Sequence, residues 1–466
     1  MSHNGYIKIS FVLLLASIIM LSCKKDTDLT SSLTNNGNGN TGTVVTANPD
    51  LVKDSALLIA RDLYLWYDQI PASFNARSYA DPSAIIKDIR PYSIQPGFNG
   101  PVDRWSFAMK KTEWDKLSAG MASVAGTANA AGDFGMSVFF RAEGDLRVRL
   151  VEPNSPAGQA GIKRGWRITQ INGSSNMTTS NAAAIVDQVY YASNGSFNFT
   201  TPDGGSQSKQ LNASHYTEKP VYLDTVYNYG ANKIGYLVYN SFLGNITDVK
   251  SQFQQVFSRF AAQQVTDVVV DLRYNGGGYV SLAEQLANYL APASANGGVM
   301  MSQVYNNLNT QNNSTSYFRK QGNINLPVVY FIVSKSSASA SELLVNTLRP
   351  YMDVRLVGPS ATHGKPVGYF PVSAGDWYVF PVSFKTTNKD GEGNYYNGLT
   401  VNAQVADGLD KDWGDVNETS LATVIKNITT GSYARPGAMF QEQAAVSSAN
   451  TALDEPFLKI TIGTKN

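Results

Sequence analysis

Hydrophobic residues change their spacing along the chain, and these changes predict three structured regions. Residues 51–70 place Leu, Ile, Tyr and Trp at helical spacing, which predicts a small helical domain over residues 51–130. Residues 134–151 contain an extended apolar run and then an alternating run, which predicts a β-rich domain over residues 131–215. Beyond residue 233, apolar strands alternate with amphipathic helices, as in an α/β core covered on both faces. The chain is therefore expected to be a multidomain α+β protein.

The N-terminus has a short apolar segment, from Ile9 to Cys23, that ends in small residues. It is short for a membrane span and has the size of the apolar part of a signal peptide, which predicts a signal peptide over residues 1–22. The residues up to Cys23 resemble a bacterial lipobox, in which the cysteine is lipidated; the alternative is a signal anchor with an incidental cysteine. Residues 23–50 are rich in Asn, Gly, Thr and Ser and predict a flexible tether. We expect a protein anchored in the bacterial cell envelope by a lipid on Cys23, facing the periplasm or the cell surface.

Composition excludes several classes of protein. The chain has 466 residues, which is too long for one ordinary core. Its formal net charge is +1, so nothing suggests a nucleic-acid partner. Cys23 is the only cysteine, so disulfides are not expected. Since no His, Cys or Asp cluster has ligand spacing, we expect neither a metal nor a cofactor.

Three loops of the α/β region follow strands and contain unusual residues. They are "DLRYNGGGY" (271–279), "SKSSASASELL" (334–344) and "GPSATHGKPVGY" (358–369). Active sites of such folds lie at the C-terminal ends of strands, which is where these loops would meet.

The glycine-rich loop, with Gly276, Gly277 and Gly278, has two chemical interpretations besides a simple tight turn. It nearly matches a dinucleotide-binding loop, but the acidic residue that such sites need about 20 positions later is missing. An oxyanion hole fits better, because a glycine turn presents fixed N–H groups to a developing negative charge.

The serine-rich loop lies where a strand gives way to a helix. Ser339 and Ser341 both lie there, and each could cap the helix or act as a nucleophile above its N-terminus. The G-x-S-x-G motif of hydrolases is absent. A serine nucleophile needs a base, and the third loop offers His363 and Lys365. A lysine serves as a base if burial lowers its pKa.

The β-rich region, with "SPAGQAGIKRGWRITQING" at its centre, resembles a circularly permuted PDZ domain. The resemblance implies that Phe134, Gly135 and Met136 form a carboxylate-binding loop. A bound peptide would then add as a strand to a sheet edge.

The three loops, in this order behind a PDZ-like and a helical region, resemble the C-terminal processing peptidases, or tail-specific proteases. The resemblance implies a catalytic core over residues 216–436 with a crotonase-like arrangement of ββα repeats, followed by a peripheral tail over residues 437–466. It also implies three catalytic roles. Ser339 would be the nucleophile, Lys365 the general base, and the amides of Ala340 and of Gly277 or Gly276 the oxyanion hole.

Two departures from the family pattern concern the base. Tyr369 stands where the family usually has the Gln or Glu that positions the lysine amine, and the serine and lysine are one residue further apart than expected. Tyr369 or His363 could therefore assist. The expected function is a serine endopeptidase acting on C-terminal or unfolded protein segments delivered by the PDZ domain. The alternatives are a catalytically weak or inactive lipoprotein that binds peptides or ligands, and a glycan-associated or scaffolding lipoprotein.

Overall fold

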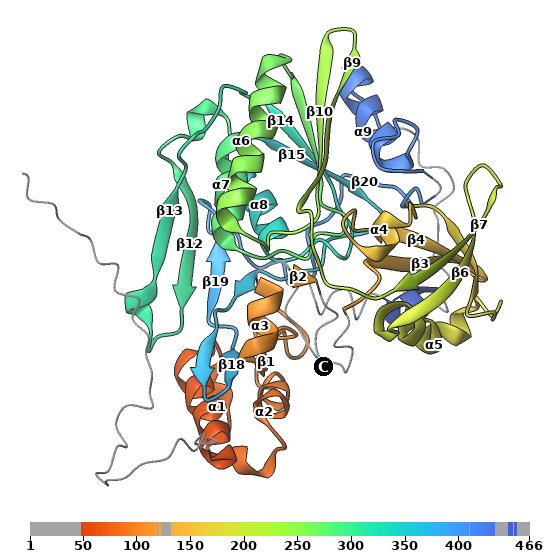
Figure 1. The fold of residues 1–466 in the computed structure, drawn as a ribbon. Helices are drawn as coiled ribbons and strands as arrows, with labels where there is room; N and C mark the ends of the chain where they lie inside the picture. The colour runs from red at the N-terminus through yellow and green to blue at the C-terminus, as the bar shows by residue number, and fades with distance from the viewer. Residues whose placement is uncertain are drawn as a thin grey trace, which may run out of the picture. The chain divides into compact units, whose positions relative to one another are not determined.

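The computed structural model describes residues 48–118, 121–122, 132–409, 411–433, 446–450 and 452–453 (Figure 1). The predicted signal peptide, Cys23 and nearly all of the tether lie outside the described residues. Among the described helices, none has the length and apolar character needed to cross a membrane.

The N-terminal region consists of short helices and two strands around an aromatic and aliphatic cluster. Asn48 accepts a hydrogen bond from an amide of the first helical turn and Asp81 does the same for the second helix, each with a proline at the helix start. The strand β1 pairs antiparallel with β18, so this region shares a sheet with the core. The elements are α1 (Pro49–Leu63), η1 (Tyr67–Gln69), η2 (Ala76–Ser78), α2 (Pro82–Ile89), β1 (Phe107–Lys110), α3 (Lys111–Ser118) and β2 (Met121–Ala122).

Residues 132–217, called here the β3–β7 domain, form an antiparallel five-stranded sheet in the order β3-β4-β5-β6-β7. Alternate residues of β4 and β6 enter its core, which also includes residues of α5. Strand β3 lies at one edge of the sheet. The elements are β3 (Met136–Ala142), β4 (Asp145–Val151), α4 (Pro156–Gln159), β5 (Arg167–Ile171), η3 (Thr179–Asn181), α5 (Ala182–Val186), η4 (Asp187–Tyr191), β6 (Asn194–Thr200), β7 (Ser206–Asn212) and β8 (Tyr216–Thr217), which pairs with β2.

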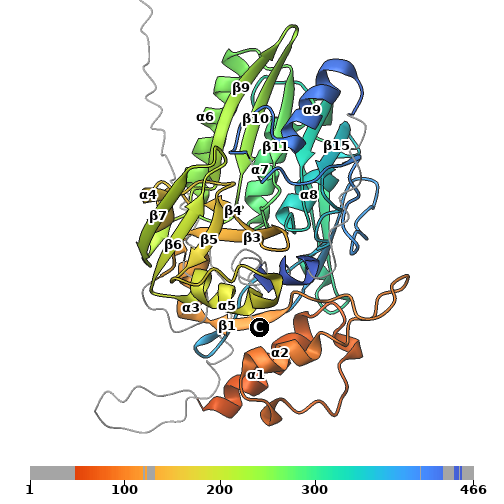
Figure 2. The same cartoon turned by 90° about the vertical axis from the view of Figure 1, so that its right-hand side faces the viewer.

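The central sheet has six strands in the order β20-β15-β14-β11-β10-β9, parallel except for β9 (Figures 1 and 2). Val268 and Val270 of β11 pack on the face with α6, α7 and α8, and Val269 packs on the face with α9. This burial on both faces explains the continuous apolar strands. The elements are β9 (Val221–Tyr229), β10 (Asn232–Tyr239), α6 (Ile246–Ala262), β11 (Asp267–Asp271), α7 (Val280–Leu290), β14 (Val328–Ile332), α8 (Ala340–Leu348), β15 (Asp353–Gly358), β20 (Ala403–Gln404) and α9 (Thr419–Thr430).

Two smaller sheets complete the core. One has the order β13-β12-β19-β16, and the other joins β1, β18 and β17. Their strands are β12 (Val299–Tyr305), β13 (Ser314–Tyr317), β16 (Val367–Gly368), β17 (Val372–Ala374), β18 (Trp377–Phe380) and β19 (Phe384–Thr387), with the short helices η5 (Ala293–Ala295) and η6 (Thr310–Asn312).

The C-terminal residues 446–450 and 452–453 are helical and pack into the core of the β3–β7 domain. The expectation of a peripheral tail over residues 437–466 does not hold for them. Val446, Ala449 and Leu453 have the spacing of one helical face and are between 0% and 6% exposed. The sequence signal was weak because polar residues separate these few apolar positions.

Candidate active site

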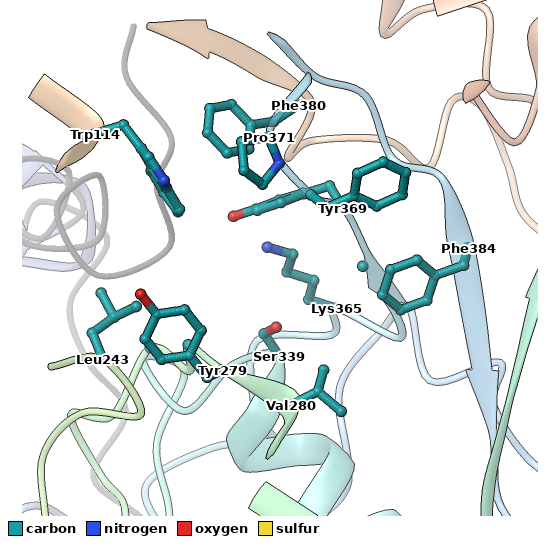
Figure 3. A pocket seen from close by; sticks show the side chains of 14 residues that line it. Trp114, Leu243, Tyr279, Val280, Ser339, Lys365, Tyr369, Pro371, Phe380 and Phe384 are labelled. Carbon is teal, nitrogen blue, oxygen red and sulfur yellow. The ribbon is translucent and has the colours of Figure 1, made fainter. Parts of the chain in front are cut away.

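The three loops singled out in the sequence leave neighbouring strand ends. Strands β11, β14 and β15 are adjacent and parallel, so their C-terminal ends lie at the same edge of the sheet. Ser339 and Lys365 both line one cavity at this edge, and Figure 3 shows their side chains beside each other within it.

Three of the five serines between Ser334 and Ser341 bind the serine loop to the glycine-rich loop. Ser334, Ser337 and Ser341 each donate a side-chain hydrogen bond to a backbone carbonyl of residues 272–275. The Ser341 hydroxyl is 2.8 Å from the carbonyl oxygen of Asn275, and Ser341 is only 1% exposed. Ser341 therefore faces the protein interior, whereas Ser339 lines the cavity.

Ser339 lies at the junction of the loop and α8 in an unusual backbone conformation. Its φ is +55°, which is rare for a residue other than glycine and costs about 1–3 kcal/mol. Its side chain is partly exposed and lines the cavity, with the positive end of the α8 dipole next to it. The strained turn thus presents one hydroxyl to the cavity.

Gly277 lies directly against this turn. A Cβ atom on Gly277 would lie 2.8 Å from Ser339 Cβ and 2.9 Å from the amide nitrogen of Ala340. The N–H of Gly277 already donates to Asn275 Oδ1 at 2.9 Å, whereas Gly276 and Gly278 line the cavity. Gly277 therefore allows the close approach of the two loops, and its amide is already used within its own turn.

Glu342 joins the serine-rich loop, residues 334–344, to the loop of residues 358–369, called here the lysine loop. Its carboxylate is fully buried and accepts hydrogen bonds from the amides of Ser339 at 3.0 Å, Gly364 at 2.6 Å and Lys365 at 2.8 Å, and from the Thr362 hydroxyl. Burial raises the pKa of Glu342, and these donors oppose the change. In the sequence, the available signal for this position is a glutamate three residues after Ser339, the spacing of a helix-capping box.

Lys365 is 3% exposed. Burial lowers the pKa of its amine to about 7, although the nearby carboxylates of Asp103 and Glu342 favour the charged form. About half of the Lys365 side chains would therefore be neutral near pH 7, which is the form that accepts a proton.

The Lys365 amine lies over the ring of Tyr369, with Nζ 3.9 Å from the ring centroid. Tyr369 is itself held edge-on by Phe107 and Phe380. Burial raises the pKa of the Tyr369 hydroxyl, so it stays protonated. Among the described hydrogen bonds, none joins Ser339 Oγ to Lys365 Nζ. The amine thus faces an aromatic ring where the family pattern has a Gln or Glu, and in this arrangement it does not engage the serine.

The side chain of His363 binds a residue of the N-terminal region. Its Nε2 accepts a hydrogen bond from Nε1 of Trp105 at 3.0 Å, and its backbone N–H donates to the Ser337 carbonyl. Burial, with the cations of Arg104 and Lys365 nearby, lowers the pKa of His363 to about 4. The neutral imidazole therefore connects the lysine loop to the N-terminal region.

The N-terminal region contributes groups that the sequence did not suggest. Asp103 is buried, accepts a hydrogen bond from the Tyr64 hydroxyl at 2.8 Å and lies close enough to Lys365 to affect its pKa. Trp114 of α3 lines the cavity. No local motif relates these residues to the strand ends, because the contact depends on the pairing of β1 with β18.

The cavity has a volume of about 220 Å³ and mostly apolar walls (Figure 3). Its lining residues are Trp114, Leu243, Gly276, Gly278, Tyr279, Val280, Ser339, Lys365, Gly368, Tyr369, Phe370, Pro371, Phe380 and Phe384. Such walls favour apolar groups in the space beside Ser339. Among the described residues, no group of three or more His, Cys, Asp or Glu side chains is arranged to hold a metal ion.

Charged residues connect the glycine-rich loop to the β3–β7 domain. Arg164 of that domain donates to the Tyr274 hydroxyl at 2.7 Å and pairs with Asp407. Arg273, next to Tyr274, pairs with Asp407 at 2.8 Å and with Glu418 at 2.9 Å. The backbone just before the three glycines is therefore fixed by buried ion pairs.

The predicted carboxylate-binding loop begins strand β3. The side chains of Phe134 and Met136 are buried in the domain core. Gly135, at φ +70°, donates its N–H to Asp133 Oδ1 at 2.7 Å. The position expected to hold a peptide carboxylate is thus occupied by the chain's own carboxylate.

The fold and the site together define a class of protein. Its α/β core has a helical region and an antiparallel sheet domain attached, and one cavity at the strand ends of the core contains a serine and a buried lysine. Two family models match the chain, Peptidase family S41 over residues 233–402 and the Peptidase S41 N-terminal domain over residues 58–107. These two regions match domains of peptidase family S41, and this confirms the resemblance to the C-terminal processing peptidases that was predicted from the three loops.

Individual relatives agree with this assignment. The carboxy-terminal processing protease CtpB of Bacillus subtilis is 25% identical over 239 residues, which are 50% of this chain and 47% of the relative. The chain thus matches about half the length of this curated relative. The crystal structure of a putative S41 protease from Bacteroides fragilis has a TM-score of 0.65 at 22% identity, covering 81% of this chain and 97% of that one. The second comparison supports the fold alone.

Proposed function

We propose that the chain is a serine endopeptidase in which Ser339 is the nucleophile and Lys365 the general base. The observation that supports this most strongly is a buried lysine with a pKa near 7 in the same cavity as a serine at a helix N-terminus. A base whose pKa lies near the operating pH is the most effective proton acceptor.

In the proposed mechanism the neutral Lys365 amine turns from the ring of Tyr369 toward Ser339 Oγ and takes its proton. The oxygen attacks the carbonyl carbon of the scissile peptide bond. The negative charge on the carbonyl oxygen is stabilised by the amide of Ala340 and by an amide of Gly276 or Gly278, which line the cavity. Lys365 then gives its proton to the leaving amine, and water hydrolyses the acyl-enzyme on Ser339.

Tyr369 acts in this proposal as a positioning residue. Its ring stabilises the ammonium form of Lys365 through a cation–π contact, which at buried sites is worth about 2 kcal/mol. It therefore holds the amine within the cavity between proton transfers.

We further propose that the β3–β7 domain is a PDZ domain that delivers protein segments by pairing them with β3, and that the core is crotonase-like. The support is the order of its elements and the position of β3 at a sheet edge beside α5. Lipidation of Cys23 would place the enzyme at the cell-envelope membrane. Protein or peptide substrates are the partners that this arrangement implies.

A second candidate function is a catalytically weak or inactive peptide-binding protein that keeps the peptidase fold. It is favoured by one observation, namely that the Lys365 amine contacts Tyr369 and has no hydrogen bond to Ser339 in the described structure.

Casein digestion separates the two candidates. Ser339→Ala and Lys365→Ala should abolish cleavage, whereas His363→Ala should retain it. Ser336→Ala, in the same loop but outside the cavity lining, is the matched control and should cleave like the wild type. Cleavage that survives Ser339→Ala would refute the nucleophile assignment, and an inactive wild type would favour the binding protein.

A further inference from the structure

Among the described strands, none pairs with the outer edge of β3. The N–H groups of Val138 and Phe140 point away from β4, and both are bound by side chains. The hydroxyl of Tyr190, in η4, accepts from Val138 at 3.1 Å. Asn450, from the far end of the chain, binds Phe140. A strand edge with free N–H and C=O groups is a template for another extended chain, and here side chains occupy it.

Asn450 binds Phe140 as a peptide unit of an added strand would. Its Oδ1 accepts from the N–H of Phe140 at 2.7 Å, and its Nδ2 donates to the carbonyl oxygen of the same residue at 2.9 Å. Asn450 is 4% exposed. The primary amide has one acceptor and one donor group to offer, which are the groups that β-strand pairing uses.

The helix that carries Asn450 has one buried face and one exposed face. Val446 is 2%, Ala449 6% and Leu453 0% exposed, whereas Ser448 on the opposite face is exposed. With Asn450 these positions follow the i, i+3, i+4, i+7 pattern of an amphipathic helix. The described residues of this helical segment, 446–450 and 452–453, are called here the C-terminal segment.

That surface is formed by β3 together with α5 and η4. The buried residues of the segment share one apolar cluster with residues of all three elements, among them Val138, Phe140, Ile185 and Val189. In Figures 1 and 2 the blue C-terminal turn lies beside α5 in both views. Residues 446–450 and 452–453 therefore cover the edge of β3 and the apolar surface next to it.

We propose that this surface is a binding site for an extended apolar peptide and that residues 446–450 and 452–453 occupy it in cis, so that a peptide binds by displacing them. The proposal rests on the proposed function, in which this domain delivers substrate. The partner that fits is an extended segment with a peptide unit opposite Phe140 and an apolar side chain in the place of Leu453. Such a strand can pair with the Val138 amide as well as with Phe140.

The test measures peptide affinity in the Ser339→Ala background, so that it does not depend on catalysis. The probe is a fluorescein-labelled octapeptide, Lys-Val-Ser-Val-Thr-Val-Ser-Leu, titrated by fluorescence anisotropy. Leu453→Asp places a carboxylate in the apolar cluster, and Asn450→Ala removes both hydrogen bonds to Phe140; each should release the segment. Ser448→Ala, on the exposed face of the same helix, is the matched control.

We expect Leu453→Asp to bind the probe at least about tenfold more tightly than its parent, Asn450→Ala to be intermediate, and Ser448→Ala to be unchanged. Circular dichroism shows which variants are folded. If Leu453→Asp does not fold, the test rests on Asn450→Ala. Equal affinity in the parent and the folded variants, or absence of binding to any of them, would overturn the proposal and leave the segment a permanent cover. Failure of the proposed proteolysis would instead appear as uncleaved casein and leave this titration unchanged.

Discussion

Replacing Lys365 by methionine should make the protein more stable while abolishing activity. Methionine keeps an unbranched side chain of similar length and removes only the amine that burial destabilises when charged. Lys365 is 3% exposed, and its pKa is about 7 in the folded protein against an ordinary value of 10.5. The two pKa values differ by about 3.5. Protonated Lys365 therefore lowers the free energy of unfolding of the wild type by about 5 kcal/mol compared with neutral Lys365.

The direction of the pH dependence follows from proton binding. Between pH 7 and 10.5 the unfolded wild type carries a proton on this lysine that the folded protein does not. Its free energy of unfolding therefore rises with pH in this window, by up to about 1.4 kcal/mol per pH unit. Lys365→Met lacks this contribution, so its advantage over the wild type is largest below pH 7 and disappears toward pH 10.5.

Urea unfolding followed by tryptophan fluorescence at pH 6, 7.5 and 9 measures this difference. The advantage of Lys365→Met should fall by about 2 kcal/mol between pH 7.5 and pH 9. Lys335→Met is the matched control, because Lys335 lies in the neighbouring serine loop with an exposed side chain, and it should follow the wild-type pH dependence. A difference between Lys365→Met and the wild type that stays constant with pH would refute the account of a buried base.

Three further substitutions test the geometry around the lysine. Tyr369→Leu removes the ring that stabilises the ammonium form of Lys365. The midpoint of the pH–rate profile is expected near 7 in the wild type and should move down by about one pH unit in this variant. An unchanged midpoint would contradict the cation–π role. Glu342→Gln replaces the acceptor of four hydrogen bonds. We therefore expect kcat to fall about 100-fold with little change in KM, and the free energy of unfolding in urea to fall by about 2–3 kcal/mol. Wild-type kinetics would argue against Glu342 as a positioning residue. Gly277→Ala should abolish casein cleavage because its Cβ would lie 2.8 Å from Ser339 Cβ, whereas Gly391→Ala, also at positive φ but in open space, should retain it; equal activity of the two variants would contradict the close packing of the loops.

The layered core followed from the sequence because its apolar pattern has a direct structural cause. Strands buried on both faces are continuously apolar, and the helices between them have one apolar side. The three loops could be brought together for the same reason, since the ends of adjacent parallel strands meet at one edge. Sequence reasoning was blind to the attachment of the N-terminal region, because the pairing of Phe107 with Phe380 joins residues far apart in the chain.

Within the site, the residue types were predictable and their contacts were not. Ser339 and Ser341 are equivalent by local pattern, and only burial of the Ser341 hydroxyl against Asn275 separates them. The spacing of Glu342 from Ser339 indicates at most a helix-capping box, because its bonds to the loop that contains Lys365 depend on tertiary packing. The burial of Leu453 was missed because few apolar residues, separated by polar ones, give a weak periodic signal in this part of the sequence.

The measurement that tests the central claim most directly is the site of modification by a fluorophosphonate probe, located by mass spectrometry of proteolytic fragments. The account predicts modification of Ser339 in the wild type, at a rate that rises with pH around 7 as Lys365 loses its proton, and no modification in Ser339→Ala. Lys365→Met should react far more slowly. Modification of another serine, or a Ser339 that reacts equally fast without Lys365, would contradict the assignment of the nucleophile and its base.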